Sequence, residues 1–433
     1  MKKIVLLVVL AFAALYTVAQ DEIIQLYIAQ KKWDEAKTEV DKLVANTKLK
    51  DKDKATAYFW KLTVYSQLYI DPALSAKYPD AHDQAVDALN KYLALEPDMK
   101  QLKLNATGVG NLYSGSFEKG KTYFQNKDWQ NAYKYFSEAE VMGDMLLTNK
   151  LSASTATLDT VTVLYTGYSA QNAQLPDSAV KYYTRLADIK VNEKEYEDIY
   201  KYLIQYYSDK KDETNFKKYL ALAKEVYPDD NSLWTQFEMQ NVTANANMSQ
   251  LLDKYHQELA AGGMNEDKYT GYAEAFATND SAQLAGMDSM QKVRLRLTAA
   301  EAFGKAFDLN NTMGLYAFNT GVIYYGFFQQ LDDRYSNYRG ESASLKAKRV
   351  EIAKEEMKYA DTAAQWLEKA YTTLKGKQDR SRAETTSLNR TVDYLANIYY
   401  WERDQTKTIG NPKDYDKYDN LYKKYDAEHN TYK

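Results

Sequence analysis

The chain has 433 residues, of which 45% are hydrophobic and 27% are charged, and its formal net charge is −4 at pH 7. This composition excludes a disordered chain, and the acidic balance argues against a nucleic-acid partner, which would need a basic stripe. The absence of cysteine excludes disulfides, thiolate nucleophiles, cysteine-ligated metals and a lipidated N-terminal cysteine. Because 17 glycines and 6 prolines are under half the ordinary share of about 12%, we expect an all-α protein.

Residues 1–19 have the pattern of an export signal. Lys2 and Lys3 precede the apolar run at residues 4–15, and small residues at 17–19 offer a cleavage site before Gln20. A membrane anchor is the alternative, but it would need about 18 or more apolar residues, which this segment does not reach. We therefore expect an exported protein that is not a lipoprotein, located in the periplasm or at the surface of a Gram-negative cell.

Two stretches of the chain repeat one pattern of aromatic and small residues. Residues 27–36 begin with tyrosine, carry a tryptophan and end with alanine, and residues 123–132 place the same three residue types at the same spacing. Around the second copy, Gly120, Phe136 and Ala139 complete the small and aromatic pattern that closes one helix against its antiparallel neighbour. This pattern resembles the tetratricopeptide repeat (TPR), whose signature recurs about every 34 residues.

Further segments match the pattern along the whole mature chain. In chain order they are residues 60–65 with 85–97, residues 167–183, residues 203–228, residues 299–306, residues 321–324 with 363–370, and residues 395–399. The copy at residues 234–263 departs most from the pattern, and extra residues at 329–350 and 403–414 lengthen the spacing, so longer helices or loops there could cover one face. The resemblance implies an all-α, right-handed superhelical solenoid of about nine antiparallel helix pairs.

The repeats also divide the chain. We expect a signal peptide at residues 1–19, N-terminal helical hairpins at 20–110, the best-matching repeats at 111–232, degenerate repeats at 233–310, and C-terminal repeats with a long insertion and a tyrosine-rich capping helix at 311–433. Most of the 40 tyrosines then pack between helices, as expected of the consensus positions Tyr27, Tyr123, Tyr207, Tyr324 and Tyr399. The tyrosines at 415, 418, 422 and 425 form one stripe, which caps the last repeat or forms a docking face.

The resemblance nominates a concave groove for partner binding, because residues beside the consensus glycine and tyrosine on each first helix face it. These are Lys121, Phe124, Gln125, Tyr168, Gln171, Asn172, Gln205, Tyr325, Asn397, Tyr400 and Trp401. Aromatic rings interleaved with amides suit an extended peptide or a sugar ring, and ordinary exposed or inter-repeat contacts are the alternative. The lysine, asparagine and arginine clamp with which this family holds chaperone tails is not matched at the equivalent positions.

Catalytic signatures are missing from the sequence. None of the hydrolase, zinc-protease, P-loop or dinucleotide motifs is present. His82, His256 and His429 have no second histidine at metal-ligand spacing. Two of the 60 acidic residues could still converge for glycoside cleavage, but nothing in the sequence singles out a pair. We therefore expect a protein that is not an enzyme and that holds no cofactor or metal.

Five triplets join an aspartate to a hydroxyl residue and a small or apolar residue. Their hydroxyl residues are Thr160, Ser178, Ser281, Ser289 and Thr362. The triplets resemble the acceptor motif for O-glycosylation of exported proteins in one group of Gram-negative bacteria. Helix capping is the alternative, since Asp, Ser and Thr accept hydrogen bonds from the first free amides of a helix. The two interpretations are compatible.

Two classes of function remain. The first is a non-enzymatic protein–protein interaction scaffold of the cell envelope, which binds segments of a protein or peptide partner in the groove. The alternative is a glycan-binding accessory protein, because exported sugar-binding proteins of the starch-utilisation type are also built on such repeats. Those proteins carry a lipidated cysteine, which this chain lacks. After signal cleavage we expect no integral membrane span.

Overall fold

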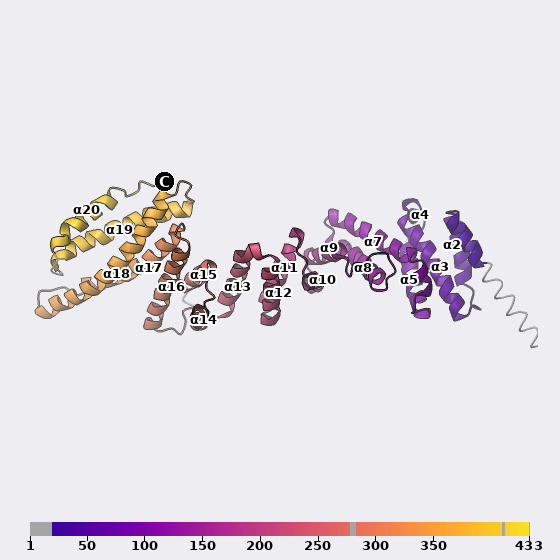
Figure 1. Ribbon diagram of the computed structural model, residues 1–433, viewed down its shortest axis with the longest axis horizontal. Helices are drawn as coiled ribbons and strands as arrows, with labels where there is room; N and C mark the ends of the chain where they lie inside the picture. The colour runs from indigo at the N-terminus through magenta and orange to yellow at the C-terminus, as the bar shows by residue number, and fades with distance from the viewer. Residues whose placement is uncertain (1–19, 278–282, 409–411, 433) are drawn as a thin grey trace, which may run out of the picture. The chain divides into compact units, whose positions relative to one another are not determined.

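The computed structural model describes residues 20–277, 283–408 and 412–432. The expected signal peptide at residues 1–19 and the expected glycosylation position Ser281 lie outside these residues. Within them every regular element is a helix and there is no strand (Figure 1). The all-α class is therefore confirmed.

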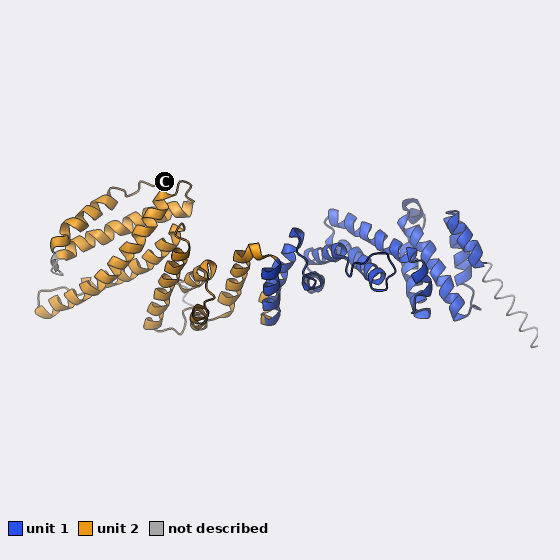
Figure 2. Cartoon of the chain, viewed as in Figure 1, with its two compact units in different colours: residues 1–207, 214–226 blue, residues 208–213, 227–433 orange. Residues whose placement is uncertain are grey.

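The chain divides into two compact units (Figure 2). Unit 1 comprises residues 1–207 and 214–226, and unit 2 comprises residues 208–213 and 227–433. The helix at residues 20–29 is followed by α2 (Trp33–Val44), α3 (Asp51–Ile70), α4 (Pro72–Lys77), α5 (Ala81–Leu95), α6 (Lys100–Leu104), α7 (Thr107–Gln125), α8 (Trp129–Thr148), α9 (Thr160–Asn172), α10 (Pro176–Asp188), η1 (Lys194–Tyr196), α11 (Glu197–Asp209) and α12 (Glu213–Val226). The next elements, all in unit 2, are η2 (Pro228–Asp230), α13 (Asn231–Asn245), α14 (Met248–Ala260), α15 (Glu266–Phe276), α16 (Ser289–Leu309), α17 (Gly314–Ser336), α18 (Ala343–Gly376), α19 (Arg382–Thr408), η3 (Pro412–Asp414) and α20 (Tyr415–Asp426).

Consecutive long helices pack as pairs within each unit. The contacts between α7 and α8, α9 and α10, α15 and α16, and α17 and α18 show this arrangement, and short turns between partners reverse the chain direction. First helices also contact the next first helix, as α13 does α15 and α17 does α19. Contacts also join α3 with α5 in unit 1 and α19 with α20 in unit 2. The TPR-like stacking of about nine pairs is confirmed, and the right-handed sense of the superhelix stays a prediction.

Small residues let the paired helices approach closely. A Cβ atom on Gly120 would lie 2.8 Å from a ring carbon of Phe136, and one on Gly167 would lie 2.6 Å from a ring carbon of Tyr183. In both pairs the glycine lies on the first helix and the ring comes 16 residues later on the second. The repeated spacing in the sequence therefore corresponds to one repeated packing contact.

The consensus tyrosines pack in the same way in separate repeats. Tyr123 stacks on Tyr135 with ring centroids 5.4 Å apart and planes 3° apart, and Tyr207 stacks on Tyr219 at 5.4 Å and 8°. The partner lies 12 residues further along the chain in both cases. The expected packing role is confirmed for Tyr123 and Tyr207, whose rings bridge the two helices of a pair.

The extra residues at 329–350 lengthen two helices instead of forming a large loop. α17 and α18 are 23 and 34 residues long, and only residues 337–342 connect them. The tyrosine stripe of α20 packs on the preceding helices, because Tyr425 is fully buried and contacts Tyr371 and Tyr399. Tyr418 also stacks on Tyr399. The stripe therefore packs against the preceding helices, and its capping role stays a prediction.

Candidate functional site

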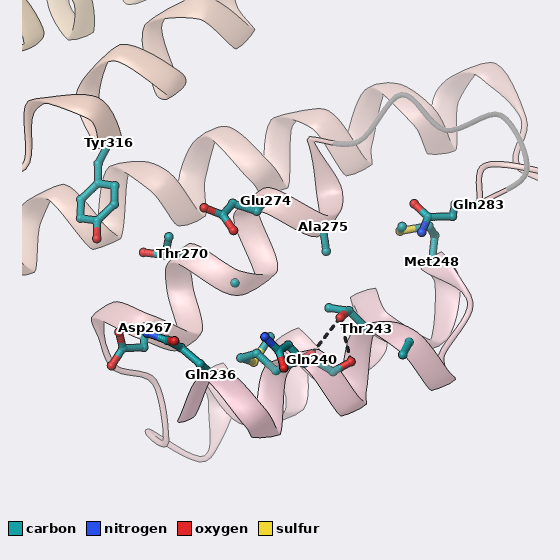
Figure 3. A pocket seen from close by; sticks show the side chains of 13 residues that line it. Gln236, Gln240, Thr243, Met248, Asp267, Thr270, Glu274, Ala275, Gln283 and Tyr316 are labelled. Atoms are coloured by element: carbon teal, nitrogen blue, oxygen red, sulfur yellow. Dashed lines mark hydrogen bonds between the residues drawn. The ribbon is translucent and has the colours of Figure 1, made fainter. Parts of the chain in front are cut away.

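A hollow of about 700 Å³ lies in unit 2 between the consecutive first helices α13 and α15 (Figure 3). We call it the α13–α15 hollow. Its lining residues are Gln236, Met239, Gln240, Thr243, Ala244, Met248, Asp267, Thr270, Gly271, Glu274, Ala275, Gln283 and Tyr316. The close-up places Tyr316 near one end and Met248 with Gln283 near the other. The hollow therefore follows the lengths of two helices, as a site for an extended ligand would.

Local sequence features fix the positions of the two helices. Trp234 on α13 is fully buried and its Nε1 donates to the carbonyl of Tyr227 at 3.0 Å, which fixes the rotation of the helix. Asn265 caps α15 by accepting from the amide of Lys268 at 2.9 Å. A Cβ atom on Gly271 would lie 3.0 Å from Cγ of Met239, so this glycine sets how closely α15 approaches α13 at the floor of the hollow.

The two helices present equivalent faces to the hollow. α13 contributes residues 236, 239, 240, 243 and 244, and α15 contributes residues 267, 270, 271, 274 and 275. Each residue of the second set lies 31 positions after its counterpart in the first. Residues at these offsets share one face of a helix. The hollow is therefore a repeat-derived surface, formed where two consecutive repeats expose the same face.

Some polar side chains of the hollow already form hydrogen bonds within the protein, and others do not. Thr243 and Thr270 donate their hydroxyl protons to carbonyls of their own helices, and Asp267 accepts from the hydroxyl of Ser232 at 2.9 Å. By contrast, the exposed side-chain amides of Gln236 and Gln240 make no hydrogen bond to any residue that the structure describes. These two amides can both donate to and accept from a ligand.

Glu274 is the second carboxylate of the hollow. Its side chain is open to solvent, and it makes neither an ion pair nor a hydrogen bond with a described residue. The surrounding protein nevertheless raises the pKa of the Glu274 carboxyl above its usual value, because desolvation disfavours the charged form. A cationic ligand group would reverse this effect by stabilising the carboxylate.

The structure brings together the expected aromatic groove residues of unit 1. The ring centroids of Phe124 and Tyr168 are 5.5 Å apart, and Trp129 contacts both rings. Tyr168 is 44% exposed, so part of this aromatic patch is accessible. Gln171 accepts a hydrogen bond from the hydroxyl of Tyr183 at 2.7 Å.

The other expected groove residues of unit 1 lie on the surface or are half-buried. Lys121 and Gln125 are exposed, and Lys121 pairs with Glu118 on its own helix. Asn172 donates to the carbonyl of Tyr168 at 2.9 Å. Gln205 on α11 is exposed. These residues are available to solvent, but their binding role stays a prediction.

Two expected groove residues of unit 2 are buried, which corrects the prediction that they face a ligand. Tyr325 is 4% exposed and stacks on Tyr394 with centroids 4.3 Å apart, while Trp401 is 9% exposed and packs edge-on against Phe328. The physical reason is the length of α17, α18 and α19, which bury these rings in the core of unit 2.

Asn397 and Tyr400 remain on the surface of α19. Asn397 donates to the hydroxyl of Tyr325 at 3.2 Å, so it is tied to the core ring below it. Tyr400 is 48% exposed, but Tyr422 contacts its edge and the Arg403 guanidinium lies 4.4 Å from its ring centroid. This ring is therefore partly occupied by its own unit.

Two of the described aspartate triplets begin a helix with a cap, and two lie within a helix. Asp159 caps α9 by accepting from the amide of Thr162, and Asp288 caps α16 in a capping box with Gln291. Capping is therefore confirmed for the triplets of Thr160 and Ser289. Asp177 is the second residue of α10, and Asp361 lies inside α18, so capping does not explain the triplets of Ser178 and Thr362. Glycosylation at these positions stays a prediction.

The sequence reasoning missed every residue of the α13–α15 hollow. The signal was present, because Trp234 fixes the register of α13 and the surface stripe follows from it at helical spacing. The segment matches the repeat pattern poorly, so the pattern predicts no groove positions there. A binding site depends on the residues that a helix exposes. A helix that matches the repeat pattern poorly still has such an exposed face.

The described part of the chain has neither a cluster of metal ligands nor a membrane-spanning helix. No three His, Asp or Glu side chains in it come together in a way that could hold a metal ion. None of the helices in it combines the length and the apolar character that crossing a bilayer requires.

Comparison with known proteins adds little. No protein-family model matches the chain, and no curated protein matches it. Among solved structures, the chain is similar to the TPR domain of P58(IPK), with 11% identity, a TM-score of 0.25, and coverage of 88% of this chain and 98% of that chain. It is also similar to a chain of the APC/C hetero-tetramer Cut9-Hcn1, with 10% identity, a TM-score of 0.20, and coverage of 95% and 98% respectively. These TM-scores are too low to support a conclusion about this chain. Its fold and its candidate site are therefore described from its own helices.

Proposed function

We propose that this protein is a non-enzymatic interaction scaffold of the bacterial cell envelope, which binds a segment of a partner protein along the exposed faces of its first helices. The export signal expected at residues 1–19 supports the envelope location. The TPR-like pairing of helices supports binding through a repeated surface, since stacked repeats present such surfaces to extended ligands.

The main support for the proposal is the α13–α15 hollow, which contains two side-chain amides without a hydrogen bond to a described residue. Gln236 and Gln240 lie one helical turn apart on α13 and reach into a hollow about 700 Å³ in volume. An extended polypeptide offers alternating N–H and C=O groups, which side-chain amides can satisfy in both directions. Met239 and Met248 add apolar surface that adapts to different side chains.

The glycan alternative has less support from the geometry. A sugar ring needs an aromatic face that is open to solvent, yet in the unit 1 patch Phe124 meets Trp129 at 87° and Tyr165 at 88°. These rings are engaged with one another edge to face. Titration of tryptophan fluorescence with oligosaccharides tests this alternative, and a saturable change with one glycan would favour it over the scaffold.

A pull-down from the native envelope tests the scaffold proposal. The mature protein and the double variant Gln236→Ala/Gln240→Ala are each used as bait, and partners retained by the wild type are identified and purified. We expect direct binding between the purified proteins, weakened at least tenfold by the double variant. Equal binding of the two baits would show that the partner does not use this hollow.

A second double variant gives a matched control. Gln257 and Asp253 lie exposed on α14, outside the lining of the hollow. The variant Asp253→Ala/Gln257→Ala changes the same number of polar surface residues in the same unit. We expect it to bind the partner as the wild type does, and a loss equal to that of the hollow variant would contradict the site assignment.

A further inference from the structure

We propose that the α13–α15 hollow selects a segment bearing lysine or arginine, with Glu274 as the group that pairs with the cation. This inference rests on the proposed function and adds the chemical class of the partner. It is the opposite of the ligand that the family's known clamp takes, which is an anionic carboxylate tail.

The charge of the lining is the first argument. Among the described residues that line the hollow, Asp267 and Glu274 carry negative charge and none is a lysine, arginine or histidine. Both carboxylates lie on α15, two turns apart, and so face one wall of the hollow. A basic segment would therefore meet attraction without repulsion, and an acidic segment would meet the reverse.

Lys268, the basic residue of α15, does not neutralise the carboxylates of Asp267 and Glu274. Lys268 lies 3.0 Å from the carboxylate of Glu258 and 3.7 Å from that of Glu238. Its side chain is thus held between two other carboxylates and is largely buried, at 16% exposure. Glu274 has no ion-pair partner among the described residues, so its charge remains available to a ligand.

The rest of the hollow fits the long stem of a basic side chain. Lysine and arginine carry three or four methylene groups that pack on apolar surface while the charged head stays at a polar site. Met239 is 5% exposed and Met248 is also 5% exposed, and together with Ala275 they give the floor its apolar part. The side chain of Glu274 would receive the charged head, while Gln236 and Gln240 would bind the backbone of the segment.

Selection from a library of short random peptides displayed on phage tests the inference. The bait is the immobilised mature protein, and selected peptides are resynthesised with blocked ends and measured by fluorescence anisotropy. We expect the selected peptides to be enriched in lysine and arginine. We expect Glu274→Gln to weaken their binding about tenfold and Glu274→Lys to abolish it, because a charged hydrogen bond is lost and then replaced by repulsion. Asp253→Asn on α14 should leave binding unchanged.

The outcomes separate the two proposals. Selected peptides without basic enrichment that bind Glu274→Lys as tightly as the wild type would overturn the charge inference while leaving the scaffold in place. A library that yields no binder to the wild type at low salt would count against both. Circular dichroism of each variant before and after heating shows whether a loss of binding follows a loss of fold.

Discussion

A glutamate buried in the core of unit 2 gives the sharpest stability prediction. Glu356 on α18 is 0% exposed, and neither of its carboxylate oxygens has a hydrogen-bond partner among the described residues. Burial, together with the neighbouring charge of Asp332, raises the pKa of Glu356 from 4.5 to about 8. The folded protein therefore holds a proton on Glu356 at neutral pH, whereas the unfolded chain does not.

The sign and size of the effect follow from linkage. Because the pKa of Glu356 is higher in the folded state, its contribution to stability is fully present below pH 4.5 and is lost as pH rises toward 8. Each pH unit in this window costs about 1.4 kcal/mol, so the wild type loses about 3 kcal/mol between pH 4.5 and pH 7 through this group. Glu356→Gln cannot ionise and avoids that loss.

Urea unfolding followed by circular dichroism at pH 5 and pH 8 measures the difference. We expect Glu356→Gln to unfold at a higher urea concentration than the wild type at pH 8 and at a similar concentration at pH 5. Glu355→Gln is the matched control, since Glu355 is the exposed neighbour on the same helix. If Glu356→Gln and Glu355→Gln show the same dependence on pH as the wild type, the argument from the buried carboxyl is refuted.

Three further substitutions test other parts of the structure. Glu402→Gln should stabilise the protein by about 3 kcal/mol at pH 7, because burial and the charge of Asp361 raise the pKa of Glu402 to about 9; urea unfolding measures it. Gly120→Ala should cost about 1–3 kcal/mol by overpacking against Phe136, and a melting temperature equal to that of the wild type would contradict the close contact. Asp159→Ala should cost about 1–2 kcal/mol through the lost helix cap, whereas Asp159→Asn should recover most of it in the same melting experiment.

The sequence predicted the fold because its repeats encode contacts that recur. The glycine-to-ring spacing of Gly120 and Phe136 returns in Gly167 and Tyr183, and each pair marks one helix pressed against its partner. Low glycine and proline content excluded most alternatives to helix. Such local and periodic signals survive even where repeats share few identical residues.

The site was harder to predict because exposure depends on helix length and on neighbours that the pattern does not specify. The expected groove residues Tyr325 and Trp401 are buried, since α17 and α18 are longer than a standard repeat and cover that face. Conversely, Gln240 and Glu274 lie in a hollow within a segment whose packing pattern is weak. A consensus records which residues pack, and it leaves the chemistry of the remaining surface unspecified.

Site-specific photocrosslinking tests the central claim most directly. A photoreactive amino acid is placed at Gln240 in the α13–α15 hollow, or at Asp253 on α14 as the control, and the protein is irradiated in the native envelope. The scaffold account predicts a crosslink to one polypeptide from position 240 and none to it from position 253. Crosslinks to that partner from both positions alike, or from position 253 alone, would contradict it.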